Sequence, residues 1–147
     1  MWRSEDLGAT WEVAKLTKGL VDDWAANNPQ LAAMMNWTDQ PLPFADAFSQ
    51  IWSLGYADGT LYAGTKPARL LASRDGGKSW EEVYGLRNHP SADSWNPGAA
   101  GLVLHTILFD PANAEKLWVG ISAAGVFATE DGGKTWDRRN RLSNIEL

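Results

Sequence analysis

The chain contains no cysteine, and it is poor in several other residues that mark particular kinds of protein. Without cysteine, the 147 residues can form neither a disulfide framework nor a thiolate metal site. Only two histidines are present, which leaves few nitrogen ligands for a metal ion. We therefore expect no metal site and no cofactor. The lack of cysteine is also compatible with a cytoplasmic location, which is our expectation.

Positive charge and long apolar runs are scarce as well. Thirteen basic residues stand against 18 acidic ones, which gives a net charge of −5. A protein that binds the phosphate backbone of nucleic acids needs a basic face. No apolar run approaches the roughly 20 residues of a membrane helix. The sequence therefore predicts no nucleic-acid partner and no membrane partner.

The composition is otherwise that of one globular domain, with 44% hydrophobic and 21% charged residues. Tryptophan is unusually frequent, with nine residues. No signal-peptide pattern occurs at the N-terminus. Met1 leads directly into a repeated motif, so we do not assume that it is the native start of the protein.

An eight-residue pattern occurs three times along the chain. The copies are 4-SEDLGATW-11, 73-SRDGGKSW-80 and 129-TEDGGKTW-136, and they share the form Ser/Thr-x-Asp-x-Gly-x-Ser/Thr-Trp. Their starts are 69 and 56 residues apart. Unequal spacing indicates one repeated structural unit with insertions of different length between the copies.

The residue types of the octapeptide are those of a tight turn. The aspartate can accept hydrogen bonds from backbone N–H groups, the glycine can take a positive φ, and the tryptophan can fold back over the hairpin. We therefore assign a structural role to Ser4, Asp6, Gly8, Thr10, Trp11, Ser73, Asp75, Gly77, Ser79, Trp80, Thr129, Asp131, Gly133, Thr135 and Trp136.

Two chemical interpretations of the octapeptide are disfavoured. A phosphate-binding loop needs more glycines and a Lys-Ser/Thr pair that opens a helix, whereas a strand-like run follows here. A calcium loop of the EF-hand type needs acidic residues at alternate positions and a distal glutamate.

Four short strand-like runs recur around each of the second and third copies. The runs are 48–57, 61–65, 69–73 and 80–84, and then 102–110, 117–122, 125–129 and 136–140. Turn residues separate them, as in an antiparallel meander. The first copy supplies only the last two strands of such a unit.

The pattern divides the chain into six segments. We expect the second half of a unit in 1–14, an insertion in 15–47, a complete unit in 48–84, a long loop in 85–101, a second complete unit in 102–141, and the start of the next connection in 142–147. Within the insertion, residues 28–37 favour a short helix, with Asn28 as N-cap and Pro29 at its first position. The composition of 85–101 disfavours any regular element.

The octapeptide resembles the Asp-box, also called the bacterial neuraminidase repeat (BNR), found in sialidases, sortilin-like receptors, xyloglucanases and photosystem assembly factors. Those proteins are β-propellers of four-stranded antiparallel blades, in which the box joins the third strand to the fourth. The segments 89–111 and 121–136 also look like bacterial sialidase-like, or glycosyl hydrolase-like, repeat proteins. The resemblance implies an all-β propeller with about two and a half blades in this chain.

A blade takes about 40–50 residues, so 147 residues cannot close a ring. The resemblance therefore implies a fragment of a propeller of six or seven blades. Open sheet edges would then be filled by the remaining blades or by self-association.

The resemblance carries no catalytic residue over to this chain. A sialidase needs an arginine cluster, a Tyr–Glu pair and an acid, and the Phe/Tyr-Arg-Ile-Pro motif that provides the first arginine is absent. Whether the chain belongs to an enzyme stays undecided. We expect ligand or carbohydrate recognition at a central funnel, and the alternative is part of a sialidase-like glycoside hydrolase with catalytic residues outside this chain.

The candidate ligand-binding residues are His89, Trp95, Asn96 and His105. His105 lies at the start of a blade, where the first strand lines the channel of a propeller. The other three lie in the long loop, which we expect to help form the funnel mouth. For His105, a structural role in the inner strand and a ligand contact both stay open.

Overall fold

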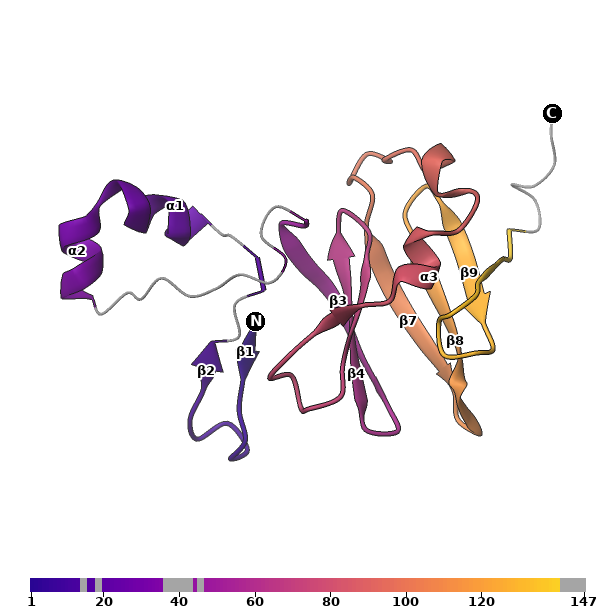
Figure 1. Ribbon diagram of the computed structural model, residues 1–147, viewed down its shortest axis with the longest axis horizontal. Coiled ribbons are helices and arrows are strands. Elements are labelled where there is room, and N and C mark those ends of the chain that lie inside the picture. The colour runs from indigo at the N-terminus through magenta and orange to yellow at the C-terminus, as the bar shows by residue number, and fades with distance from the viewer. Residues whose placement is uncertain (14–15, 18–19, 36–43, 45–46, 141–147) are drawn as a thin grey trace. The chain divides into compact units, whose positions relative to one another are not determined.

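The computed structural model describes residues 1–13, 16–17, 20–35, 44 and 47–140 (Figure 1). The chain forms two compact units, Met1–Ser49 and Gln50–Leu147, which are described separately. Among the described residues, no helix is long and apolar enough to cross a membrane.

The first unit contains a small hairpin and two helices. Strands β1 (Trp2–Arg3) and β2 (Glu12–Val13) pair antiparallel and flank the first octapeptide. We call the three octapeptides Asp-boxes, after the motif that they resemble. Helix α1 (Leu20–Asn27) is followed at once by α2 (Pro29–Met34), which has Pro29 in its first turn. Only α2 falls within the predicted helical segment.

The prediction that Asn28 occupies the N-cap position of the helix is confirmed. Asn28 does precede α2, but its side chain makes no capping hydrogen bond to that helix. Its Nδ2 instead donates to the Trp24 carbonyl oxygen at 2.9 Å. Because α1 ends immediately before Asn28, an unpaired carbonyl of α1 is within reach of the amide.

The second unit begins with a four-stranded antiparallel sheet in the order β3-β4-β5-β6. Its strands are β3 (Gln50–Ala57), β4 (Thr60–Lys66), β5 (Leu70–Ser73) and β6 (Glu81–Glu82). The second Asp-box forms the turn from β5 to β6. A bulge between Ile51 and Ser53 interrupts the pairing of β3 with β4.

A second sheet repeats this order with β7 (Leu104–Asp110), β8 (Asn113–Ile121), β9 (Gly125–Thr129) and β10 (Asp137–Arg138). The third Asp-box joins β9 to β10. The two sheets confirm the predicted fold class, an all-β chain of four-stranded antiparallel blades, and they do not close into a ring.

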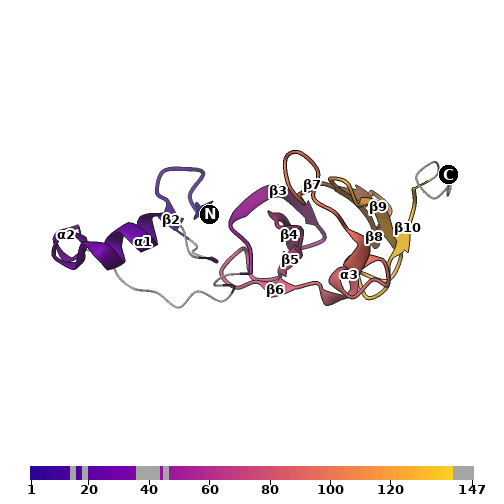
Figure 2. The same ribbon diagram turned by 90° about the horizontal axis from the view of Figure 1, so that it is seen from above.

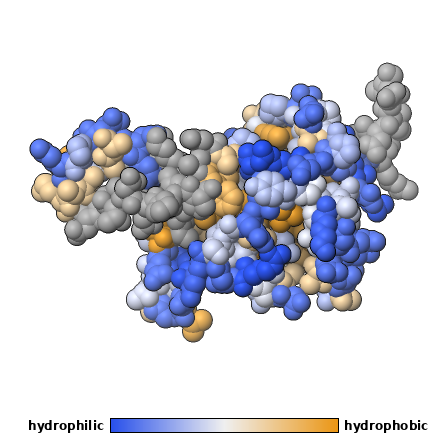
Figure 3. Space-filling model, in the orientation of Figure 1, coloured by the Kyte–Doolittle hydropathy of each residue, from blue (hydrophilic) through white to orange (hydrophobic). Residues whose placement is uncertain are grey.

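The hydrophobic core lies between these two sheets. Strand β7 of the second sheet packs against β3 and β4 of the first, and the two first strands lie side by side in Figure 2. The core comprises Tyr62, Leu70, Ala72, Leu86, Leu104, Leu117, Val119, Ile121, Ala124, Phe127 and Trp136. Figure 3 shows that the visible surface of this unit is mostly hydrophilic, with hydrophobic residues scattered among the hydrophilic ones.

The expectation that residues 85–101 hold no regular element is wrong. Helix α3 (Tyr84–Arg87) forms one turn there, and a 3₁₀ turn covers Ala92–Ser94. Tertiary contacts explain the helical turn, because Leu86 is buried in the core and Arg87 pairs with the buried Glu82 carboxylate at 3.1 Å. These contacts outweigh a composition that favours a loop.

Candidate functional site

The Asp-box turns form a closed hydrogen-bond network around the aspartate. In the third box, Asp131 Oδ1 accepts from the backbone N–H of Thr135 at 2.9 Å, and Oδ2 accepts from the Thr135 hydroxyl at 2.5 Å. The Thr129 hydroxyl donates to Asp131 Oδ1 at 2.7 Å and accepts from the Gly133 N–H at 3.0 Å. Trp136 Nε1 donates to the Gly133 carbonyl at 2.9 Å.

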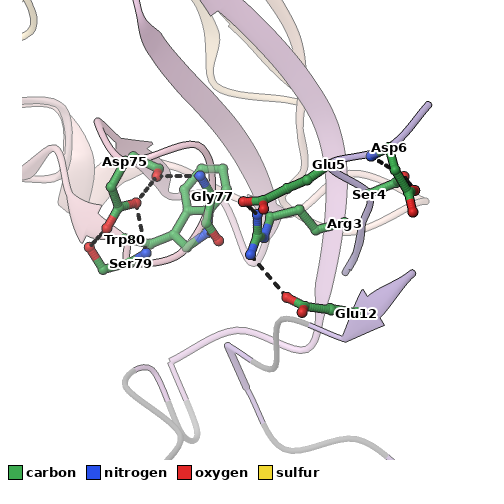
Figure 4. Close-up of polar contacts among 10 residues, drawn as sticks. Arg3, Ser4, Glu5, Asp6, Glu12, Asp75, Gly77, Ser79 and Trp80 are labelled. Carbon is green, nitrogen blue, oxygen red and sulfur yellow. Dashed lines mark hydrogen bonds and ion pairs between the residues drawn. The ribbon is translucent and has the colours of Figure 1, made fainter. Parts of the chain in front are cut away.

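The other two boxes repeat this network. Asp75 accepts from the backbone N–H and hydroxyl of Ser79 at 2.8 and 2.5 Å, and Trp80 Nε1 donates to the Gly77 carbonyl at 3.1 Å. Asp6 accepts from both donors of Thr10 at 2.7 and 2.5 Å. Figure 4 shows the contacts of the Asp75 carboxylate within its turn.

These hydrogen bonds stabilise the charged form of the carboxylates. The hydroxyl of Thr135, followed by its backbone N–H, lowers the pKa of Asp131 from 3.8 to about 2. Ser79 lowers the pKa of Asp75 to about 2 in the same way, and Thr10 lowers the pKa of Asp6. A general acid for glycoside hydrolysis needs a raised pKa, so this environment is unsuited to that role.

A carboxyl titration tests this network. Because the pKa is lower in the folded state, each carboxylate stabilises the fold above pH about 4, and this contribution is lost as the pH falls through about 2. We expect Thr135→Val to raise the pKa of Asp131 by removing its main donor, while Asp75 in the same chain stays near 2. NMR of the carboxyl carbons measures both, and an unchanged Asp131 midpoint in the variant would contradict this explanation.

The boxes lie at one end of the two sheets. Ser73, at the start of the second box, pairs with Leu61 at the beginning of β4. Thr129, at the start of the third, pairs with Leu117 of β8, which in turn pairs with Phe109 near the end of β7. His105 lies near the start of β7, beside the end of β8, and therefore at the opposite end. The sheets thus separate the box carboxylates from this candidate residue.

His89 and Trp95 lie together in the connection between the sheets. His89 Nδ1 is 2.7 Å from Ser91 Oγ, and Trp95 Nε1 donates to the same oxygen at 3.0 Å. Both rings pack against Phe127, with centroid distances of 5.2 and 5.1 Å. Because Phe127 is fully buried, these two side chains cover the core. Asn96 is exposed beside them.

His105 lies apart from that group. No hydrogen bond or ring contact within the described part of the chain joins it to His89, Trp95 or Asn96. It occupies the bulge where β7 shifts register between Leu104 and Thr106, and its Nδ1 is 2.7 Å from Thr106 Oγ1. The imidazole is exposed. Bulges often reorient a side chain next to a functional site in this way.

A hollow of about 400 Å³ lies beside His105. Its polar lining includes Ser122, Arg138 and Asn140. Arg138 donates from Nε and Nη2 to the Ala124 carbonyl at 3.0 and 2.6 Å, and Asn140 Nδ2 donates to the same oxygen at 3.0 Å. These bonds hold the rim of the hollow in one geometry.

The lining of the hollow lacks the pair of carboxyl groups that glycoside hydrolysis requires. None of its lining residues is an aspartate or a glutamate. Within the described residues, no group of three histidine, cysteine or acidic side chains could hold a metal ion. A larger hollow, of about 470 Å³, lies along the second box, but Asp75 there is engaged in the turn and Arg74 is paired with Glu81.

Trp52 is a candidate that the sequence analysis missed. It occupies the bulge of β3, which corresponds to the position of His105 in β7. Its side chain is 51% exposed, and Lys66 Nζ lies 5.9 Å from the ring centroid. Exposed aromatic rings with a nearby polar donor are common in ligand sites. The strand register reveals the correspondence, because Ser53 pairs with Gly64 just after the bulge of β3 and Thr106 pairs with Gly120 just after the bulge of β7.

Comparison with known proteins gives two relatives and no matching family model. The chain is 28% identical over 137 residues to the oligoxyloglucan-reducing end-specific xyloglucanase of Emericella nidulans, across 91% of this chain but 14% of the relative. It is 35% identical over 78 residues to a probable enzyme of the same description from Neosartorya fischeri, across 52% of this chain and 9% of the relative. Over most of its length, the chain is thus similar to a small part of a xyloglucanase.

Proposed function

We propose that the chain forms part of a β-propeller that binds a carbohydrate at the end of the sheets opposite the Asp-boxes. The observation that carries this proposal is the hollow beside His105, which has polar side chains and backbone groups but no carboxylate in its lining. Sugars are bound by such convergent polar groups together with aromatic faces. The similarity to xyloglucanases makes a xyloglucan oligosaccharide the first ligand to test.

The Asp-boxes have no part in this recognition. Their carboxylates are engaged by the turns, and they lie at the other end of the strands. We propose that each Asp-box closes the hairpin formed by the last two strands of its sheet. The first strand of the sheet and its bulge then lie in a rigid sheet.

A second candidate function is glycoside hydrolysis by a larger assembly. The names of both relatives support it, since they describe xyloglucanases. Hydrolysis requires two carboxyl groups on either side of the scissile bond, about 5–10 Å apart. The hollow beside His105 offers none, so the catalytic pair would lie outside this chain.

Isothermal titration calorimetry with a xyloglucan oligosaccharide tests the first candidate. We expect binding by the chain, and His105→Ala should weaken it about tenfold, because one side chain's hydrogen bonds to the sugar are lost. Asp93→Ala, an exposed change outside the hollow, serves as the control and should bind normally.

Two outcomes would contradict the binding proposal. One is the absence of heat with the oligosaccharide at millimolar concentration. The other is equal affinity in the chain and in His105→Ala. Release of a reducing end by the chain alone would instead favour hydrolysis over simple binding.

A further inference from the structure

Arg138 differs from the other arginines of the described residues in its charge partner. The others each form an ion pair with a carboxylate, namely Arg3, Arg69, Arg74, Arg87 and Arg139. Arg138 is half-buried and has no carboxylate partner within the described part of the chain. In a chain with an excess of acidic residues, this unpaired charge is a feature that the fold does not explain.

The Arg138 guanidinium is nevertheless held in one position. Its Nε and Nη2 both donate to the Ala124 carbonyl oxygen, and its guanidinium carbon lies 5.9 Å from the centroid of the Phe127 ring. Phe127 is fully buried, so the ring is fixed by the core around it. A solvated arginine, by contrast, moves among many rotamers. Arg138 is thus ordered by the fold before any ligand binds.

The contact with Ala124 leaves one end of this guanidinium unused. Nη1 makes no hydrogen bond within the described residues, and Nη2 carries a second N–H. Together, these two nitrogens can donate two parallel hydrogen bonds to the two oxygens of a carboxylate. The end of Arg138 is therefore available to a carboxylate that does not belong to the chain.

The corresponding position of the first sheet holds the opposite charge. Glu82 follows the tryptophan of its Asp-box by two residues, as Arg138 does. The Glu82 side chain is 1% exposed and is paired with Arg69 at 3.0 Å and with Arg87 at 3.1 Å. In the first sheet, the chain itself thus neutralises the charge at this position.

The second sheet has no such partner at the place of Arg69. Gly125 lies there, since both residues stand four positions before the start of their Asp-boxes. A Cβ on Gly125 would lie 1.9 Å from Asn140 Nδ2, so the space for a side chain is taken by Asn140. The Asn140 amide is neutral, and its hydrogen bonds are to the backbone. The counter-charge of Arg138 must therefore come from elsewhere.

We propose that the ligand of the hollow is an acidic saccharide whose carboxylate binds to the end of the Arg138 guanidinium; this inference rests on the carbohydrate binding proposed above. Arg138 lines the hollow, and the lining contains no aspartate or glutamate that would repel an anion. The carboxylate of the sugar supplies the charge partner that Arg138 lacks. An oligosaccharide of uronic acid residues is the simplest ligand of this class.

Isothermal titration calorimetry with a matched pair of sugars tests the proposal. The pair is a trisaccharide of β-linked glucuronic acid and its methyl ester, which keeps the rings and removes the charge. We expect the chain to bind the acid about tenfold more tightly than the ester, because charge-assisted hydrogen bonds are stronger than neutral ones. This comparison uses the unmodified chain, so it does not depend on the folding of any variant.

Two arginine variants then locate the charge that recognises the acid. Arg138→Gln removes the proposed partner, and Arg139→Gln removes an equal charge from the exposed neighbour, which is paired with Asp137. The ratio of the two affinities should fall to about one in Arg138→Gln and stay unchanged in Arg139→Gln, since a general effect of net charge would change both alike. Arg138→Lys keeps the charge without the fork and should retain part of the preference.

Contrary results separate this inference from the proposed function. Equal affinities of the unmodified chain for the acid and the ester would overturn the inference and leave the binding of neutral sugars intact. A preference for the acid that survives in Arg138→Gln, or that is lost equally in Arg139→Gln, would overturn the assignment to Arg138. If neither trisaccharide nor a xyloglucan oligosaccharide bound, the proposed function would fail together with the inference.

Discussion

Phe127→Ala is expected to lower the free energy of unfolding of the second unit by about 3–5 kcal/mol, the range for truncating a buried phenylalanine. The Phe127 side chain is fully buried at the centre of the core. His89 and Trp95 pack on its ring, and the Arg138 guanidinium carbon lies 5.9 Å from its centroid. Phe127→Ala therefore removes the ring against which the connection between the sheets packs. It also removes the ring beside Arg138, which lines the hollow.

Urea denaturation followed by far-UV circular dichroism measures this loss. A stability of about 5–15 kcal/mol is typical of a domain, so the variant should be close to unfolding at 37 °C. The neighbouring residue Val126 is 43% exposed, and Val126→Ala should change the stability by less than about 1 kcal/mol. Equal losses of stability in Phe127→Ala and Val126→Ala would contradict the placement of Phe127 at the centre of the core.

The second large effect concerns Gly64, whose place between the sheets admits no side chain. A Cβ there would meet Ser53 Oγ at 2.3 Å and the Leu104 carbonyl oxygen at 2.4 Å. Backbone atoms cannot move aside easily, so Gly64→Thr must separate β4 from β7. We expect a loss of about 3 kcal/mol, at the upper end of the usual range for overpacking.

Gly120→Thr is the matched control, since Gly120 has the corresponding position in the second sheet. The closest atom to its Cβ would be His105 Cε1 at 3.1 Å, which belongs to an exposed side chain that can turn away. The change should cost less than about 1 kcal/mol. Thermal melting of both variants at low protein concentration compares them, and a similar loss at the two positions would contradict the contact between the sheets.

The fold was predictable because its signals are local. Each Asp-box is a turn in which the hydrogen bonds of the aspartate stay within the octapeptide, as those of Asp131 show, so residue types at fixed spacing are enough to identify it. The strands between the boxes also follow from short apolar runs bounded by turn residues. Two complete blades could therefore be predicted without any information on long-range contacts.

The features that sequence reasoning missed depend on contacts between distant residues. The helical turn of α3 relies on Leu86 reaching the core and Arg87 reaching Glu82. Asn28 bonds to α1, a helix that the sequence analysis did not predict. The correspondence of Trp52 with His105 depends on two bulges, which appear only when strand register is known.

The candidate ligand-binding residues were predicted as one group, and the structure places them in two. His89 and Trp95 pack against Phe127, whereas His105 lies in the bulge of β7. The sequence contains no signal for this division, because the division depends on which face of a strand each side chain contacts. A role for His105 in ligand binding stays a prediction.

The central claim is that the Asp-boxes hold the architecture while the opposite end of the sheets binds ligand. An NMR titration of the ¹⁵N-labelled chain with a xyloglucan oligosaccharide tests it most directly. We predict that the largest shift changes fall on His105, Gly120 and Ser122, with the backbone N–H groups of Ser79 and Thr135 unchanged. The largest changes at Ser79 and Thr135 would contradict the account.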